Sequence, residues 1–119
     1  QGMEDQALQH FQLALDEQPE NVNLLSSVAW LLATHSDVSK RDPQQAKLLA
    51  ERAWNASDHQ APLAADALAA AYAGLNQFDR AVEIAELAIQ AAQKFDLSQL
   101  MTEIRLRQEQ YKQGRVLRN

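Results

Sequence analysis

The chain contains no cysteine and few residues that interrupt helices. Its 119 residues include three glycines and three prolines, and aromatic side chains make up 6% against 46% hydrophobic residues. Without cysteine, neither a disulfide framework nor a thiolate metal site is possible. So few helix breakers in a chain rich in alanine, leucine and glutamine predict an all-α fold. The length fits a single domain, residues 1–119, that can bury a core without covalent staples.

Long apolar runs and an excess of positive charge are also missing. No stretch reaches the roughly 18–20 apolar residues that span a bilayer, and no signal peptide is visible, so we expect no membrane insertion by this chain. The net charge of −5 argues against a general nucleic-acid binder. A cysteine-free sequence suits the cytosol and the periplasm alike, and a longer, membrane-associated parent stays compatible with it. Gln1 and Gly2 are either native or the remnant of a tag-removal site.

The charge is unevenly distributed along the chain. Residues 97–119 carry five basic and two acidic side chains, a balance of +3, which leaves −8 for residues 1–96. The interpretation we favour is a solvated last helix with a frayed basic end. The alternative is a strip that docks an acidic partner.

Turn and capping signals divide the chain into six expected helices. Pro19 ends the first, Asn21 can cap the second, and Asp42 followed by Pro43 is a strong start for the third. Asp96 or Ser98 can cap the sixth. Hydrophobic periodicity places the helices at about residues 4–17, 22–34, 43–55, 62–75, 77–94 and 97–114.

Three segments share one pattern of small and apolar residues, called the skeleton below. An alanine comes first, a phenylalanine or alanine follows four residues later, and a second alanine follows three residues after that. A large apolar residue comes next. The segments are "DQALQHFQLAL", "QQAKLLAERAW" and "DRAVEIAELAI", and their first alanines are Ala7, Ala46 and Ala81, separated by 39 and 35 residues. Periods of this size are typical of stacked helical pairs. Alanine at a helix crossing lets two backbones approach closely.

The stretch "LAAAYAGLNQFDRA" resembles the tetratricopeptide repeat, with Leu68, Ala69, Tyr72, Phe78 and Ala81 in matching places, and the copy before it offers Leu25, Val28, Ala29 and Leu32. Asn76 replaces the usual turn glycine. The resemblance implies an α-solenoid of antiparallel helix pairs: the second helix of a truncated repeat at 3–19, a repeat at 22–56 with an extended loop at 35–43, a repeat at 62–94, and a capping helix at 97–114. "AWLLATH", "RDPQQAKLLAERA" and "EIRLRQEQYKQGR" are similar to the C-terminal repeats of large bacterial members.

Catalytic patterns are missing. There is no HExxH, GxSxG or glycine-rich phosphate loop, and His10, His35 and His59 are too scattered to hold a metal. We therefore predict no enzyme activity, cofactor or metal, and expect the three histidines to be exposed and polar.

The family resemblance also implies a concave partner-binding face. On the second and fourth helices the positions that would face it are Asn23, Ser26, Ser27, Trp30, Thr34, Leu63, Asp66, Ala70 and Ala73. Some members bind a C-terminal carboxylate with Lys, Arg and Asn at such places; here Ser, Asp, Trp and Ala occupy most of them, so we do not expect a carboxylate clamp. Trp30 is either an exposed binding anchor or, as we favour, a core residue under loop 35–43. Trp54 is expected in the core.

Three functions follow as hypotheses. The leading one is a scaffold that binds a peptide or partner protein on the concave face. The second is an accessory, substrate-positioning domain of a larger enzyme or membrane-associated assembly factor. The third is a structural array cap whose exposed first helix stacks onto upstream repeats or self-associates.

Overall fold

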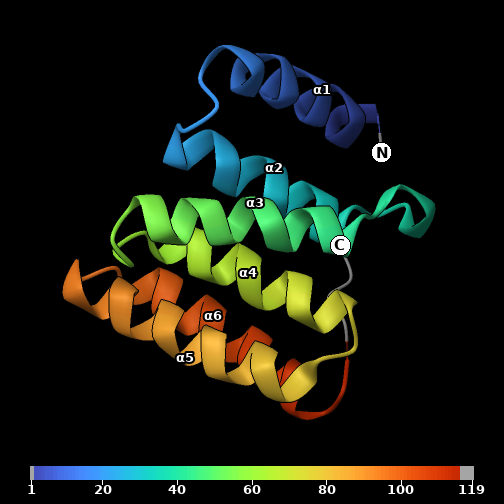
Figure 1. Cartoon of the computed structure of the whole chain (residues 1–119). Coiled ribbons are helices and arrows are strands. Elements are labelled where there is room, and N and C mark those ends of the chain that lie inside the picture. The colour runs from blue at the N-terminus through green and yellow to red at the C-terminus, as the bar shows by residue number, and fades with distance from the viewer. Residues whose placement is uncertain (1, 116–119) are drawn as a thin grey trace.

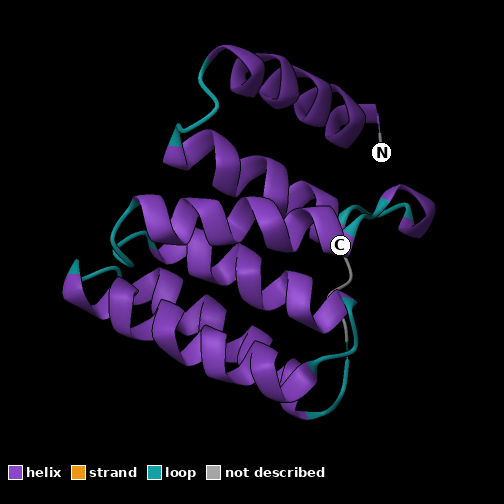
Figure 2. Ribbon diagram, in the orientation of Figure 1, coloured by secondary structure: helices purple, strands orange, loops and turns teal. Residues whose placement is uncertain are grey.

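The computed structural model describes residues 2–115, and these residues contain six α-helices and no strand (Figure 2). The all-α prediction is therefore confirmed for this part of the chain. A short 3₁₀-helix, η1, lies in the loop between the second and third helices. The helices are α1 (Gly2–Glu17), α2 (Val22–Thr34), η1 (Val38–Lys40), α3 (Pro43–Ala56), α4 (Pro62–Gly74), α5 (Phe78–Lys94) and α6 (Ser98–Lys112).

Two of the expected helix caps are present. The Asn21 side chain accepts a hydrogen bond from the Leu24 backbone N–H at 3.0 Å, and Asp42 accepts one from Gln45 at 3.1 Å. The expected cap of α6 is wrong, because Leu97 occupies that position and no side chain caps the helix. α1 also begins two residues earlier than expected, at Gly2.

The turns before α5 and α6 use the same backbone geometry. Asn76 and Asp96 have φ angles of 62° and 57°, in the left-handed region. The next residue then closes each turn, with Gln77 N–H donating to the Tyr72 carbonyl and Leu97 N–H to the Ala92 carbonyl, both at 2.9 Å. Asparagine and aspartate tolerate this conformation better than most side chains. Asn76 therefore suits the conformation that its turn requires.

The helices stack in chain order and run in alternating directions (Figure 1). α4 lies at the centre, packed against α2, α3 and α5, while α6 packs against α5 and α1 mainly against α2. The described part of the chain measures 32 × 30 × 22 Å.

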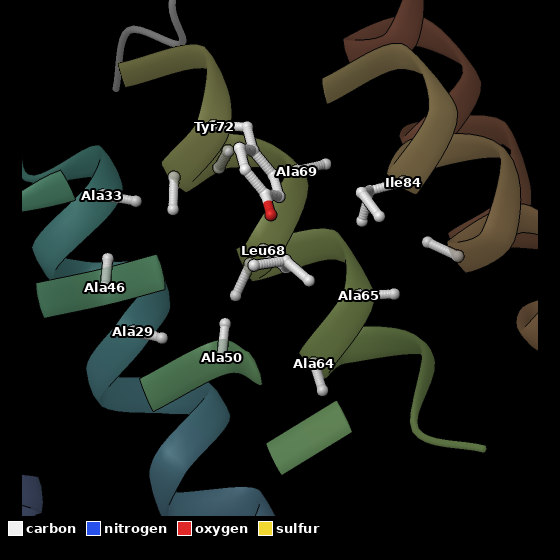
Figure 3. Packing of buried hydrophobic residues seen from close by; sticks show 14 of the residues in the cluster. Ala29, Ala33, Ala46, Ala50, Ala64, Ala65, Leu68, Ala69, Tyr72 and Ile84 are labelled. Carbon is white, nitrogen blue, oxygen red and sulfur yellow. The ribbon is translucent and has the colours of Figure 1, made fainter. Parts of the chain in front are cut away.

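Alanines line the crossings around α4. All ten side chains from Ala64 to Ala73 are buried, so this part of the helix is covered on every side. In Figure 3, Leu68 and Tyr72 project from α4 toward the alanine faces of α2 and α3. Small side chains at the crossings let the backbones come close, and the few large ones fill the remaining space.

α5 is buried on two faces, as expected for a helix between α4 and α6. Ala81, Ala85 and Ile89 are buried on one face, and Ile84 and Ala91 on the other. Leu87, on the same helix, is 39% exposed.

α6 covers α5 with an apolar stripe. Ile104 and Tyr111 are fully buried, and Leu100 and Met101 pack against the core. Leu97 is 41% exposed and does not belong to the stripe. Residues 116–119, part of the predicted basic end, lie outside the described residues.

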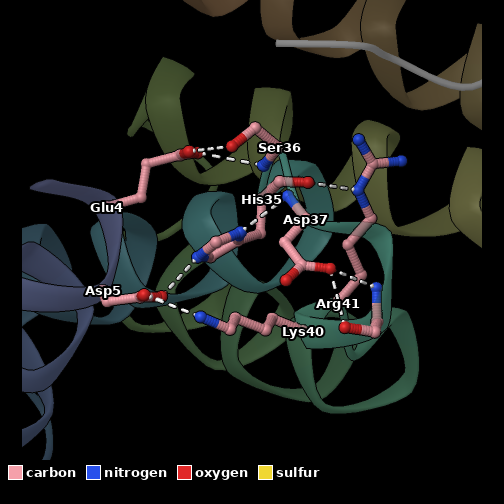
Figure 4. A network of polar contacts seen from close by, with 8 residues as sticks. Glu4, Asp5, His35, Ser36, Asp37, Lys40 and Arg41 are labelled. Atoms are coloured by element: carbon pink, nitrogen blue, oxygen red, sulfur yellow. Dashed lines mark hydrogen bonds and ion pairs between the residues drawn. The ribbon is translucent and has the colours of Figure 1, made fainter. Parts of the chain in front are cut away.

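A polar network attaches α1 to the loop between α2 and α3 (Figure 4). His35 is 0% exposed, so its predicted exposure is wrong. Its Nδ1 accepts a hydrogen bond from the Asp37 backbone N–H at 3.0 Å, which leaves Nε2–H to donate to Asp5 at 2.8 Å. The Arg41 side chain donates to the His35 carbonyl at 2.6 Å. His35 thus serves as an interior link between α1 and this loop.

Further charges surround this link. Lys40 Nζ lies 2.7 Å from Asp5, and the Ser36 backbone N–H and hydroxyl both donate to the Glu4 carboxylate. The hydrogen bond from Lys40, followed by the one from His35, lowers the pKa of Asp5. The Ser36 hydroxyl lowers the pKa of Glu4. His35, Ser36 and Lys40 therefore have hydrogen-bond partners on α1.

Candidate functional site

A cavity of about 400 Å³ opens on the face formed by α1, α2, α4 and α6. This volume lies within the range of small-ligand and peptide-anchor pockets. Most of its walls are apolar, with three charged side chains at one side. The lining residues are Ala7, Phe11, Ser26, Ser27, Trp30, Leu31, Leu63, Asp66, Leu100, Glu103 and Arg107.

Five of the predicted site residues meet at this cavity, namely Ser26, Ser27, Trp30, Leu63 and Asp66. The other four do not line it. Asn23 is exposed on α2 outside it, and Thr34, Ala70 and Ala73 are buried. Thr34 donates its hydroxyl to the Trp30 carbonyl at 2.8 Å, one helical turn back. The side chains of Ala70 and Ala73 belong to the hydrophobic core.

Trp30 forms part of the cavity wall. Its side chain is half-buried, with one part packed against the core, which corrects the favoured interpretation that Trp30 is wholly a core residue. The Arg107 guanidinium carbon lies 5.1 Å from the centre of its ring, within the range of a cation–π contact. Trp54, by contrast, is in the core as expected, and its ring stacks on His59.

Asp66 and Arg107 form a two-point ion pair between α4 and α6. Arg107 Nε donates to Oδ1 at 3.1 Å, and Nη2 donates to Oδ2 at 2.6 Å. The Asp66 side chain is 5% exposed and that of Arg107 is 20% exposed, so the pair is largely shielded from water. This fork-shaped geometry holds the guanidinium in a fixed orientation beside Trp30.

The electrostatics of the cavity follow from this burial. Desolvation raises the pKa of the Asp66 carboxyl, the Arg107 charge opposes this, and the nearby Glu103 carboxylate adds to the increase. Tyr111 on α6 is 1% exposed, and its pKa is raised mainly by burial and further by the Asp66 charge. Tyr111 therefore stays neutral at physiological pH.

Six lining residues were not predicted as site residues: Ala7, Phe11, Leu31, Leu100, Glu103 and Arg107. The α6 residues were assigned to a cap, and the α1 residues to a helix crossing. Arg107 could have been predicted as a site residue, because it is a basic residue on the polar side of α6. Its partner Asp66 is 41 residues away, so periodicity alone could not pair them.

Within residues 2–115, no cluster of three or more His, Asp or Glu side chains has a geometry that could hold a metal ion. None of the described helices combines the length and the apolar character needed to cross a membrane. Scans against protein-family models, curated proteins and solved structures found no match to this chain.

Proposed function

We propose that this chain is a protein–protein interaction module that binds a peptide or partner segment in the cavity between α1, α2, α4 and α6. The observation that carries the proposal is a preformed, mainly apolar hollow beside a fixed Trp–Arg contact. Tryptophan and arginine are enriched among residues that dominate binding energy, especially where they sit in well-packed pockets. The Asp66 pair orients the guanidinium before any partner arrives, which lowers the entropy cost of binding.

We further propose that the architecture is of the tetratricopeptide type. Two features support this. Consecutive helices alternate in direction and pack against their chain neighbours, and α2 also packs against α4. The repeated skeleton is buried alike in both complete copies, where Ala46, Ala50 and Ala53 and their counterparts Ala81, Ala85 and Ala88 are all 0% exposed.

The proposal is tested by selecting ligands from a phage-displayed random-peptide library and mapping them by NMR. We expect selected peptides to shift the Trp30 indole N–H signal. Leu63→Asp should abolish binding, because Leu63 is 56% exposed on the cavity wall. The matched control is Leu48→Asp, at a similarly exposed leucine on α3, 47% exposed and outside the cavity. The proposal fails if both variants bind equally or if the shifts lie away from Trp30.

A second function, self-association through α1, is favoured by one observation. In α1 the skeleton positions Ala7, Phe11 and Ala14 are all half-buried, whereas their counterparts in α3 and α5 are 0% exposed. Leu13 on the same helix is 62% exposed. A second copy of the chain could cover this surface. Light scattering over a concentration series tests it, and a constant monomer mass would exclude it.

A further inference from the structure

The cavity contains three charged groups, and only two of them neutralise each other. Asp66 and Arg107 are paired, while Glu103 is exposed and forms no ion pair with any residue from 2 to 115. Two carboxylates and one guanidinium leave the cavity with a charge of about −1 at neutral pH. Glu103 lies near enough to influence the Asp66 carboxyl.

Arg107 is poorly placed to receive an anion. Two of its nitrogens already donate to Asp66, and its guanidinium faces the Trp30 ring. A ligand carboxylate would therefore compete with an existing two-point pair and be repelled by Glu103.

The negative charge continues toward the start of α6. A neighbouring shallow hollow shares Leu100 and Glu103 with the cavity and is also lined by Asp96. Asp96 is exposed, and it has no ion-pair partner within the described part of the chain. Two unneutralised carboxylates thus flank Leu100 at one end of the binding surface.

We propose that the cavity selects a cationic partner segment, in which an apolar side chain fills the hollow against Trp30 and Leu63 while a neighbouring lysine or arginine meets Glu103. This inference rests on the proposed function and adds the chemistry of the partner. An apolar anchor suits walls made by Phe11, Leu31 and Leu100. The partner's positive charge complements Glu103 and Asp96, which favours encounter and rejects acidic segments.

The test uses matched sets of labelled, alanine-based peptides with one central leucine or phenylalanine. Within a set, one adjacent position is arginine, its neutral analogue citrulline, or glutamate. Affinity is measured by fluorescence polarisation, and the binding position by the Trp30 indole N–H signal. We expect the arginine peptide to bind roughly three- to fivefold more tightly than the citrulline peptide, as is typical of an exposed ion pair. The difference should shrink as salt is added.

Two variants on α6 test whether Glu103 causes the preference for the arginine peptide. Glu103→Gln should remove the preference for arginine over citrulline. Glu109→Gln removes the same charge from an exposed site outside the cavity, and should leave the preference intact. Both residues lie on the surface, so neither substitution removes core packing.

The outcomes separate this inference from the function on which it rests. If all three peptides shift Trp30 and bind equally, the charge selectivity is wrong and the binding site stands. If the arginine preference survives Glu103→Gln, the selectivity does not come from this carboxylate and the inference is overturned. If no peptide binds, or binding leaves Trp30 unchanged, the proposed function and the inference fail together.

Discussion

Arg107 on α6 holds Asp66 on α4 through two hydrogen bonds of 3.1 and 2.6 Å, across 41 residues of sequence. α5 separates these two helices in the chain. The pair therefore ties the last helix to the central one directly, on the side where the candidate cavity opens. It also fixes the position of the guanidinium over Trp30.

Breaking this pair from the Arg107 side should destabilise the fold. Arg107→Met leaves the largely buried Asp66 carboxylate without its partner, and we expect a loss of about 2 kcal/mol in the free energy of unfolding. The value allows for the partial exposure of Arg107. Urea denaturation measures it. Asp66→Asn added to Arg107→Met should recover part of the loss, since no buried charge then remains.

The loss of stability caused by Arg107→Met should depend on pH. Removing Arg107 raises the pKa of Asp66 further, because the cation that opposes desolvation is gone. Below that pKa the carboxyl is neutral in the folded state, so the cost of Arg107→Met should shrink as the pH falls. A loss that stayed constant down to acidic pH, or was below about 0.5 kcal/mol at neutral pH, would contradict a shielded pair.

Enlarging an alanine at a crossing should be costly. Ala50 is 0% exposed on the face of α3 that meets α4, opposite Leu68 (Figure 3). Ala50→Leu introduces atoms for which there is no space, and we expect about 1–3 kcal/mol of destabilisation. Ala56→Leu, at the exposed end of the same helix, is the control and should change stability by less than about 0.5 kcal/mol. Thermal unfolding followed by circular dichroism compares them, and equal melting temperatures would refute tight packing at this crossing.

The α1–loop network should make stability depend on pH through Asp5. Its pKa is lowered from 3.8 in the folded state, first by the hydrogen bond from Lys40. The stabilisation is therefore present above the unfolded pKa and is lost as the pH falls through the folded one. Asp5→Asn should lower the melting temperature at neutral pH, and the difference from wild type should vanish in strong acid.

A control on the same helix separates the network from the general loss of a negative charge. Asp16 is exposed on α1, and it makes no side-chain hydrogen bond or ion pair with residues 2–115. Asp16→Asn should therefore leave the melting temperature unchanged at both pH values. If the two variants behaved alike, the network in Figure 4 would not be stabilising.

Local signals placed each of the six described helices to within two residues at either end. Asn21 and Asp42 cap their helices through contacts three residues away, and Pro19 ends the first helix within its own turn, so no distant residue is needed. The alanine skeleton likewise predicted which faces of α3 and α5 are buried. The cap of α6 was predicted wrongly. Leu97 precedes this helix and makes no side-chain hydrogen bond to it, so the sequence contains no capping residue that could indicate the position.

Contacts between distant segments decided the rest. The buried His35 ring has a hydrogen-bond partner in Asp5, 30 residues earlier, and no local pattern distinguishes it from the exposed His10. The cavity likewise requires side chains from four helices, including Arg107, whose role depends on Asp66. The sequence by itself determined where helices begin and which faces are apolar, because these depend on neighbours within a turn. Only the tertiary structure decided which polar side chains become buried partners, since that depends on which helices pack together.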